Sequence, residues 1–264
     1  MTVVVTDLTD LATTTIVLLV LASFAAGWVD AVVGGGGLIQ LPALLLVPGL
    51  APVQALATNK LASIMGTSVS AATYYRRVQP DLRTAVPTAL AALAGSAGGA
   101  ALASWLPGEV IEPIVIVALV AVLVWTVTRP TLGRANDLRW SGRRHYAAAV
   151  AIGLGLGFYD GLVGPGTGTF LVIALVAVLG YGFLEASAKA KIVNASTNLG
   201  ALVVFALAGA PVWRLGLVMG AANIGGAYMG ARMAVARGSG FVRVVFLVVV
   251  GGLILRLGWD VLAR

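Results

Sequence analysis

Charged residues are scarce in this chain of 264 residues, where Asp, Glu, Lys and Arg together make up 10%. Soluble domains carry about 25%, so this chain has too few charges to cover a surface that faces water. Cysteine is absent, which excludes disulfides and thiolate metal sites. The single histidine, His145, lies in a basic stretch, and we expect a solvated loop residue there, neither a ligand nor a general base. These absences argue against an enzyme, and no metal or other cofactor is expected.

Long apolar runs take the place of the missing charge, because 59% of the residues are hydrophobic. Runs of about 20 residues, enough for a helix to cross ~30 Å of hydrocarbon, recur from end to end. Examples are 11–33, 82–106, 111–127 and 241–262. The weakly alternating strands of a membrane barrel are absent from the sequence. The pattern predicts an all-α polytopic protein of a cell membrane, the cytoplasmic membrane if the source is a bacterium.

The net charge of +7 raises the question of nucleic acid as a partner. The basic residues gather in short loops between apolar runs, and no basic face interleaved with aromatic residues exists in the sequence. This distribution is typical of the positive-inside rule. Nucleic acid is therefore not expected, and the lipid bilayer is the expected surrounding.

Two parts of the chain resemble each other at an almost constant separation. Residues 27–34 read GWVDAVVG and residues 157–164 read GFYDGLVG, and farther on Lys60 matches Lys191. Such self-similarity predicts two homologous halves. The expected organisation is a first transmembrane repeat over 1–128, a basic cytoplasmic linker over 129–145 and a second transmembrane repeat over 146–264.

Each half divides into five apolar segments, of which the second is short and follows a glycine run. A short segment cannot cross the membrane upright. The first two segments of each half are therefore predicted to form a helical hairpin broken by irregular backbone, which membranes tolerate where it lines a cavity or is buried in protein. The segments are 11–33, 37–47, 52–75, 83–105 and 111–128, then 146–163, 168–180, 185–208, 213–235 and 241–262.

The segment count sets the relation between the halves. Five segments per half is an odd number, so the second half would be inverted in the membrane, as in many transporters. Basic loops on the cytoplasmic side would then place both termini outside. Asp7 and Asp10 precede the first run without Lys or Arg, which favours a retained first helix over a signal peptide. A count that merges the short segment with its neighbour gives four crossings per half and parallel repeats.

Charged residues inside the predicted spans are costly at depth and therefore point to function. Lys60 lies about 12 Å and Lys191 about 10 Å into their helices at 1.5 Å per residue, near the membrane midplane. Polar side chains follow each lysine at helical spacing, and a lysine with neutral donors suits a small oxyanion. The glycine runs add bare backbone amides. The candidate substrate-binding residues are Lys60, Lys191, Asn59, Ser63, Thr67, Asn194, Asn198, Gly34, Gly35, Gly36, Gly37, Gly164, Gly166 and Thr167.

Asp30 and Asp160 hold equivalent positions just before the two glycine runs. One hypothesis is that they bind and release a proton during transport, since burial and a nearby lysine push a carboxylate in opposite directions. The alternatives are that each aspartate caps the next helix, or that Asp30 simply pairs with Lys60 and holds the helices together.

Several of these residues also carry a family resemblance. The stretch from Trp28 to Gly37, the stretch Ala57-Thr58-Asn59-Lys60 and their second-half counterparts resemble the sulfite exporter TauE/SafE family of membrane permeases, over nearly the whole chain. The resemblance implies transport of sulfite, sulfonates or related organic anions, often as export. By position, the signature residues are Gly34 to Gly37, Asn59 and Lys60, then Gly164, Gly166, Lys191 and Asn198; Pro165 and the extra cation Lys189 depart from the pattern.

The sequence thus predicts a secondary transporter, an exporter of small anions that works by alternating access. No P-loop is present, so the energy would come from an ion gradient, the substrate gradient or another subunit. An anion channel and a non-enzymatic membrane subunit of a larger complex are the alternatives. The expected partners are a small anionic substrate and the bilayer, and the sequence leaves proton coupling and a homo-oligomer open.

Overall fold

A computed structural model describes residues 7–107 and 138–262, called here the first half and the second half. Every regular element in these ranges is helical, which confirms the all-α prediction for them. The expected segment 111–128 lies outside the described residues. The elements are η1 (Leu8–Asp10), α1 (Thr13–Val33), α2 (Gly37–Leu45), α3 (Pro52–Val78), α4 (Leu82–Trp105), α6 (Gly142–Leu162), α7 (Thr167–Ala174), η2 (Leu175–Leu179), α8 (Phe183–Leu207) and α9 (Trp213–Leu262).

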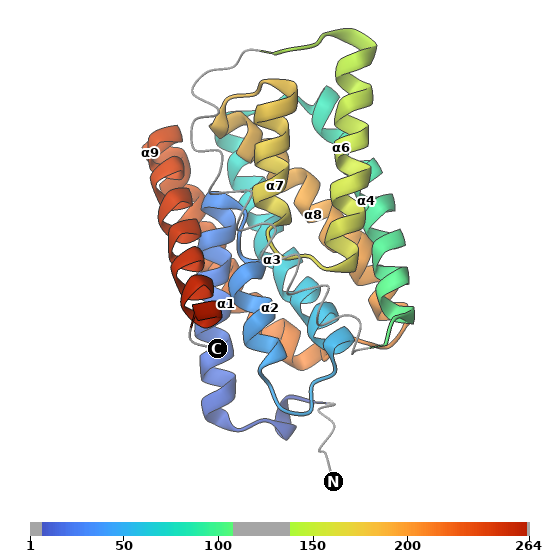
Figure 1. Ribbon diagram of the computed structural model, residues 1–264, viewed down its shortest axis with the longest axis vertical. Helices are drawn as coiled ribbons and strands as arrows, with labels where there is room; N and C mark the ends of the chain where they lie inside the picture. The colour runs from blue at the N-terminus through green and yellow to red at the C-terminus, as the bar shows by residue number, and fades with distance from the viewer. Residues whose placement is uncertain (1–6, 108–137, 263–264) are drawn as a thin grey trace.

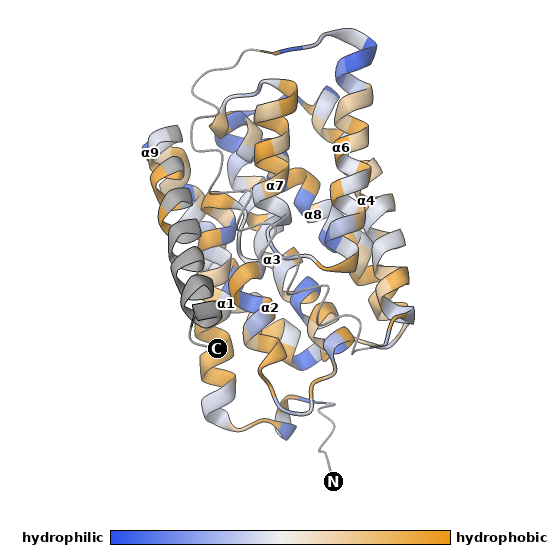
Figure 2. Ribbon diagram, viewed as in Figure 1, coloured by the Kyte–Doolittle hydropathy of each residue, from blue (hydrophilic) through white to orange (hydrophobic). Residues whose placement is uncertain are grey.

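Three of the described helices, α1, α4 and α8, are long and apolar enough to cross a membrane. Their outward faces carry large aliphatic side chains, among them Leu18, Leu90 and Val203, each at least half exposed. Such a surface is unfavourable in water and suited to lipid. Figure 2 shows hydrophobic residues in the labelled helices and a hydrophilic stretch at the start of α6. The chain is a multi-pass membrane protein.

The helix boundaries follow the expected segments with one difference at the C-terminal end. The segments 213–235 and 241–262 lie within one element, α9, which is interrupted at Gly238. The backbone there has φ 71° and ψ −168°, a conformation that glycine adopts without a steric penalty. Gly238 therefore separates the two expected segments.

Small residues let α4 and α9 pack closely against neighbouring helices. α4 of the first half packs against α6 and α8 of the second half, and α9 of the second half packs against α1 and α3 of the first half. A methyl group at Gly95 of α4 would collide with the Leu154 carbonyl, and one at Gly226 of α9 would collide with the Phe24 carbonyl. Both contacts therefore join the two halves, through the close backbone approach that small residues permit in membranes.

The helices break at matching places in the two halves. α1 ends at Gly34 with φ 85°, and the chain after α6 passes through Gly164 with φ 94° and Gly166 with φ 79°. In Figure 1, α1 begins at the lower end of the molecule and runs upward, whereas α6 begins at the upper end and runs downward. The breaks are in contact, because Thr169 donates its N–H to the Gly34 carbonyl at 3.1 Å and its hydroxyl to the Val33 carbonyl at 2.9 Å.

Candidate functional site

Two buried ion pairs join the halves next to these breaks. Lys60 Nζ of α3 lies 2.6 Å from Asp160 Oδ2 of α6, with 2% and 3% of the side chains exposed. Lys191 Nζ of α8 lies 3.1 Å from Asp30 Oδ2 of α1 and also donates to the Asp30 carbonyl. Pairing of Asp30 with Lys60 inside the first half, one alternative from the sequence, is therefore wrong. Each lysine pairs with the aspartate of the other half.

The sequence places these four groups through local helix geometry. Pro52 starts α3 at a position where its missing N–H costs nothing, and Lys60 follows about two turns later at 3.6 residues per turn. Asp30 and Asp160 each lie in the last turn of a helix that ends at a glycine break. The expectation that an aspartate caps the helix after the break is not met, because neither Gly36 nor Gly166, the N-caps of α2 and α7, is an aspartate.

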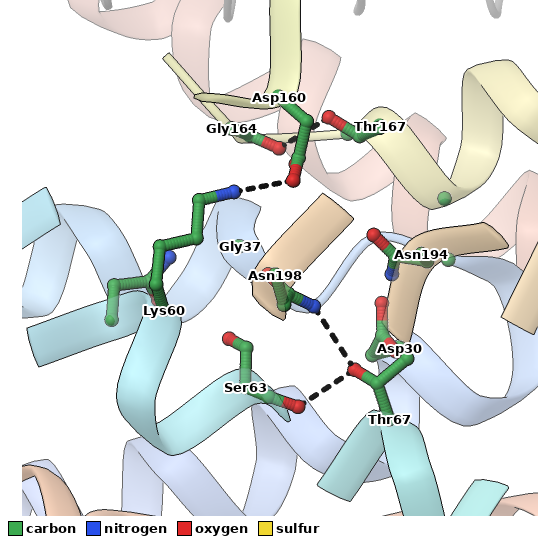
Figure 3. A pocket seen from close by; sticks show the side chains of 14 residues that line it. Asp30, Gly37, Lys60, Ser63, Thr67, Asp160, Gly164, Thr167, Asn194 and Asn198 are labelled. Atoms are coloured by element: carbon green, nitrogen blue, oxygen red, sulfur yellow. Dashed lines mark hydrogen bonds and ion pairs between the residues drawn. The ribbon is translucent and has the colours of Figure 1, made fainter. Parts of the chain in front are cut away.

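A cavity lies between the ion pairs and the breaks (Figure 3). Its free volume is about 20 Å³, room for roughly one water molecule. Every residue of the described ranges that lines it is charged, polar or glycine, in contrast to the mostly apolar lining of ordinary ligand pockets. The lining residues are Asp30, Gly34, Gly37, Asn59, Lys60, Ser63, Thr67, Asp160, Gly164, Gly166, Thr167, Gly168, Asn194 and Asn198.

Hydrogen bonds hold several polar side chains of the cavity in place. Asn198 Nδ2 donates to Thr67 Oγ1 at 3.4 Å, and Thr67 Oγ1 donates to the Ser63 carbonyl at 2.7 Å (Figure 3). Thr167 Oγ1 donates to the Gly164 carbonyl at 2.7 Å and so stabilises the second break. Asn59 Oδ1 is buried without a hydrogen-bond partner in the described ranges. Buried polar atoms are nearly always paired, so the cavity retains a group that a water or a ligand can satisfy.

The structure brings most of the predicted site residues together. Lys191 does not line the cavity itself but lies behind Asp30. Gly35 and Gly36 also lie outside the lining, and a methyl group at Gly36 would approach both the Ala26 carbonyl oxygen and Asp30 Cβ at 2.6 Å. The other candidates, including Asp30 and Asp160, line it.

One lining residue, Gly168, was missed as a site residue. A methyl group there would approach Gly34 Cα at 2.7 Å, so the residue is needed where the two breaks touch. The Gly164-to-Gly168 run in the sequence was the available signal.

The formal charge of the site is zero, because two lysines face two aspartates. Buried ions are costly unless they are paired, and this pairing explains how four charges remain inside a membrane protein. It also means that the ammonium groups are already neutralised. An anion that enters the cavity must compete with a carboxylate for its lysine.

Two basic residues, His145 and Lys189, lie outside the lining of the central cavity. His145 was expected in a solvated loop, but that expectation is wrong, since α6 begins at Gly142 and the ring is buried in its first turn. Lys189, the extra cation of α8, points away from the cavity and donates to the Asp81 carbonyl at 2.7 Å. Its ammonium also lies 3.5 Å from Glu185 Oε1.

Asp81, the residue before α4, is held in its charged form. Partial burial raises the pKa of its carboxyl, but hydrogen bonds from the Arg83 N–H and the Thr84 hydroxyl, together with the Lys189 ammonium, outweigh burial and lower the pKa below its ordinary value. Asp81 thus caps α4 and anchors α8 to it.

Comparisons with known proteins match this chain to membrane transporter proteins. A family model described as "Sulfite exporter TauE/SafE" matches residues 19–257. The chain is 36% identical to a "Probable membrane transporter protein ORF9" from Sinorhizobium sp, over 94% of each chain. It is 35% identical to "Probable membrane transporter protein YfcA" from Escherichia coli strain K12, over 85% of this chain and 82% of the relative. A "Probable membrane transporter protein" from Haemophilus influenzae is 34% identical, over 89% and 91%. No solved structure matches this chain.

Proposed function

Because this chain belongs to the sulfite exporter TauE/SafE family, we propose that it is a secondary transporter which exports a small anion by alternating access. Sulfite, sulfonates and related organic anions form the proposed substrate class. The observation that carries the proposal is the central cavity, which lies beside two ion pairs made across the halves and whose lining, in the part of the chain that the structure describes, has no apolar side chain.

In this mechanism the substrate binds where a lysine and an aspartate now pair. The anion displaces the Asp160 carboxylate from Lys60, whose Nζ is 2.6 Å away, and takes up hydrogen bonds from Asn59 and Asn198. A compact ammonium and neutral donors match the charge and the several acceptor oxygens of a small oxyanion. Specificity would then depend on the distance between the lysine and the amide groups.

Charge balance suggests a role for a proton. A neutral site that admits a monoanion becomes negative, which is unfavourable at membrane depth. If the displaced carboxylate of Asp160 or Asp30 takes up a proton, the site returns to neutrality. Anion and proton would then move in the same direction.

Alternating access follows from the inverted-repeat organisation that we propose. The halves would correspond to repeats 1–128 and 146–264, joined by a cytoplasmic linker over 129–145. Two observations support inversion: α1 and α6 run in opposite directions in Figure 1, and the α4–α6 contact has its counterpart in the α9–α1 contact. Inverted halves around a central site can open in turn toward each side of the membrane.

The small volume of the cavity supports a closed stage in the proposed cycle. About 20 Å³ cannot hold an oxyanion of several heavy atoms, since one water already needs roughly 10–15 Å³. The breaks must therefore separate for substrate to enter. Positive φ at Gly34 and Gly164 marks backbone that glycine alone adopts readily, and these are the expected hinge positions.

Flux into proteoliposomes tests the proposal. Purified protein would be offered sulfite, a sulfonate and a carboxylate in turn, with a preset anion gradient, and uptake would be compared with that of empty liposomes. Lys60→Ala should abolish flux of the preferred anion. Arg214→Ala is the matched control, because it also removes an ion pair, to Asp7 at 3.0 Å, on the exposed surface, and should transport normally. Normal flux by Lys60→Ala, or flux of no anion by wild-type protein, would contradict the proposal, whereas flux without saturation would indicate a channel.

A further inference from the structure

Hydroxyl groups continue along α3 beyond the central cavity. Lys60, Ser63 and Thr67 line that cavity (Figure 3), and Ser70 and Tyr74 follow Thr67 at intervals of three and seven residues. These intervals keep a side chain on one face of a helix with 3.6 residues per turn. Both side chains are fully buried, with 0% exposed. The face of α3 that lines the cavity therefore remains polar toward the C-terminal end of the helix.

α8 contributes a third hydroxyl at the same end of the molecule. Ser187 precedes Lys191 by four residues, on the face that also carries the cavity residue Asn198. The start of α8 lies beside the end of α3, because the Lys189 ammonium donates to the carbonyl of Asp81, three residues after α3. This end is the expected cytoplasmic side, since α3 carries its basic residues in the last turn there.

Two of the three hydroxyls have no hydrogen-bond partner. Tyr74 donates to the Ala31 carbonyl at 3.0 Å. Ser70 Oγ and Ser187 Oγ, in contrast, are buried and make no hydrogen bond within residues 7–107 and 138–262. A serine inside a helix can donate to a carbonyl of the preceding turn, but neither of these serines does. Buried polar atoms are nearly always paired, and an unpaired one is destabilising, so packing alone gives no reason for a hydroxyl at either position.

The opposite ends of the same two helices are apolar. There Thr58 of α3 accepts the N–H of Val212, which follows α8, at 3.1 Å. At a separation of 131 residues, which relates Lys60 to Lys191, the counterparts of the three hydroxyl residues belong to one apolar cluster, and each is at most 1% exposed. These counterparts are Ala201 for Ser70, Phe205 for Tyr74 and Leu56 for Ser187. Burial is thus the same toward both ends, but the hydroxyls lie toward one end only.

We propose, on the basis of the transport function inferred above, that Ser70 and Ser187 form a second contact position for the transported anion, between the central cavity and the cytoplasmic side. At 1.5 Å per residue, the two serines lie about 4–6 Å along their helices from Thr67 and Lys191, so about one helical turn separates this position from the cavity. Their hydroxyls can donate to the oxygens of a small oxyanion. Lys191, one turn away on the same face of α8, is the nearby positive charge.

Hydroxyls at this position make it easier to take an anion out of water. An anion that leaves the cytoplasm loses hydrogen bonds to water before it reaches the central lysines, and surroundings without donors make that loss costly. The two serines replace part of these hydrogen bonds. The apolar side chains toward the outside offer none, so they do not retain an anion on its way out. The protein should therefore bind its substrate more tightly from the cytoplasmic face, as suits an exporter.

Alanine substitutions, with transport measured from each face, test this position. Inside-out and right-side-out membrane vesicles give the half-saturating anion concentration at the cytoplasmic and the outer face. The probes are sulfite, methanesulfonate and acetate, and the one that wild-type protein carries fastest is used for the variants. Ser196→Ala is the matched control, because this serine of α8 lies outside the lining of the central cavity and already donates to the Ile192 carbonyl.

Ser70→Ala and Ser187→Ala should each raise the half-saturating concentration at the cytoplasmic face about two- to tenfold, as the loss of one hydrogen bond does. The value at the outer face, and both values for Ser196→Ala, should stay unchanged. Melting temperatures should not fall, because each serine substitution removes an unpaired buried hydroxyl.

Three results would overturn this position while leaving the transport function standing, provided that wild-type protein carries a probe. They are an unchanged half-saturating concentration in either serine variant, equal changes at both faces, and a lower melting temperature, which would reveal a structural role for the hydroxyl. Flux of no probe by wild-type protein would refute the transport function and this position with it.

Discussion

Lys60 and Asp160 belong to opposite halves of the chain, yet their charged atoms lie 2.6 Å apart with almost no exposed surface. The contact lies beside two helix breaks that touch through Gly34 and Thr169. The centre of the protein is therefore held by contacts between the halves. An ion pair and two glycine-containing helix breaks thus meet at one place.

The buried pair should show strong coupling in stability. Asp160→Ala leaves the Lys60 ammonium unpaired in a buried site, and removal of one partner costs about 3–5 kcal/mol. The double substitution Lys60→Ala with Asp160→Ala should be less destabilising than the sum of the single ones. Unfolding of the four proteins by denaturant in micelles measures the coupling. Additive effects would show that the two residues do not stabilise each other. The exposed pair of Arg214 and Asp7 is the reference, with an expected coupling energy of about 0–1 kcal/mol.

Gly34→Ala should damage the protein at the meeting point of the breaks. Its φ of 85° disfavours alanine, and the added methyl group would collide with Gly168. Strain of this kind costs about 1–3 kcal/mol, and flux should fall because the breaks no longer meet. Gly155→Ala is the control, since nothing lies within 4 Å of its added methyl group. Equal melting temperatures and equal fluxes for the two variants would contradict this account.

Asparagine substitutions separate proton coupling from simple binding. Asp30→Asn and Asp160→Asn keep the size of the side chain but cannot titrate. We expect both variants to bind the anion and exchange it across the membrane, but to lose accumulation driven by a pH gradient. Counterflow measures exchange, and uptake under an imposed pH gradient measures accumulation. Unchanged gradient-driven accumulation by both variants would place the coupling elsewhere.

The direction of the helices can be checked by labelling. The chain has no cysteine, and Ser141 before α6 and Ala208 after α8 are both exposed. Ser141→Cys should react with an impermeant thiol reagent only from the cytoplasmic side, because the basic loops are expected there. Ala208→Cys should react only from outside. Labelling of both from the same side of right-side-out vesicles would reject the proposed orientation.

Asp81 predicts a pH dependence of stability. Its pKa in the folded protein lies below the ordinary value of 3.8, so its stabilising contribution is complete above the ordinary value and is lost as the pH falls through the lowered one. Wild-type protein should be more stable than Asp81→Asn near neutral pH, and the difference should shrink below about pH 4. Thermal unfolding in micelles across this range measures it. A difference that grows with acidity would refute the assignment.

The sequence predicted the helices well because apolar length and glycine breaks are local signals. The same patterns located Lys60, Asn59, Thr67 and Asn198, whose spacing along α3 and α8 follows helix geometry. The partners of the lysines could not be predicted, since pairing depends on how the halves pack and not on spacing. His145 was misplaced for a related reason. Its burial results from contact with Tyr181 and Thr84, which come from distant parts of the chain.

The ion pairs across the halves also bear on how the protein is made. A nascent chain that has inserted only α1 to α4 holds Asp30 and Lys60 in the bilayer, while the partners that neutralise them in the finished structure are not yet synthesised. Uncompensated charges within the hydrocarbon are costly. The two ion pairs of the finished structure therefore form only after α6 and α8 have been inserted. The pairing that builds the central cavity thus also distinguishes a complete chain from an incomplete one.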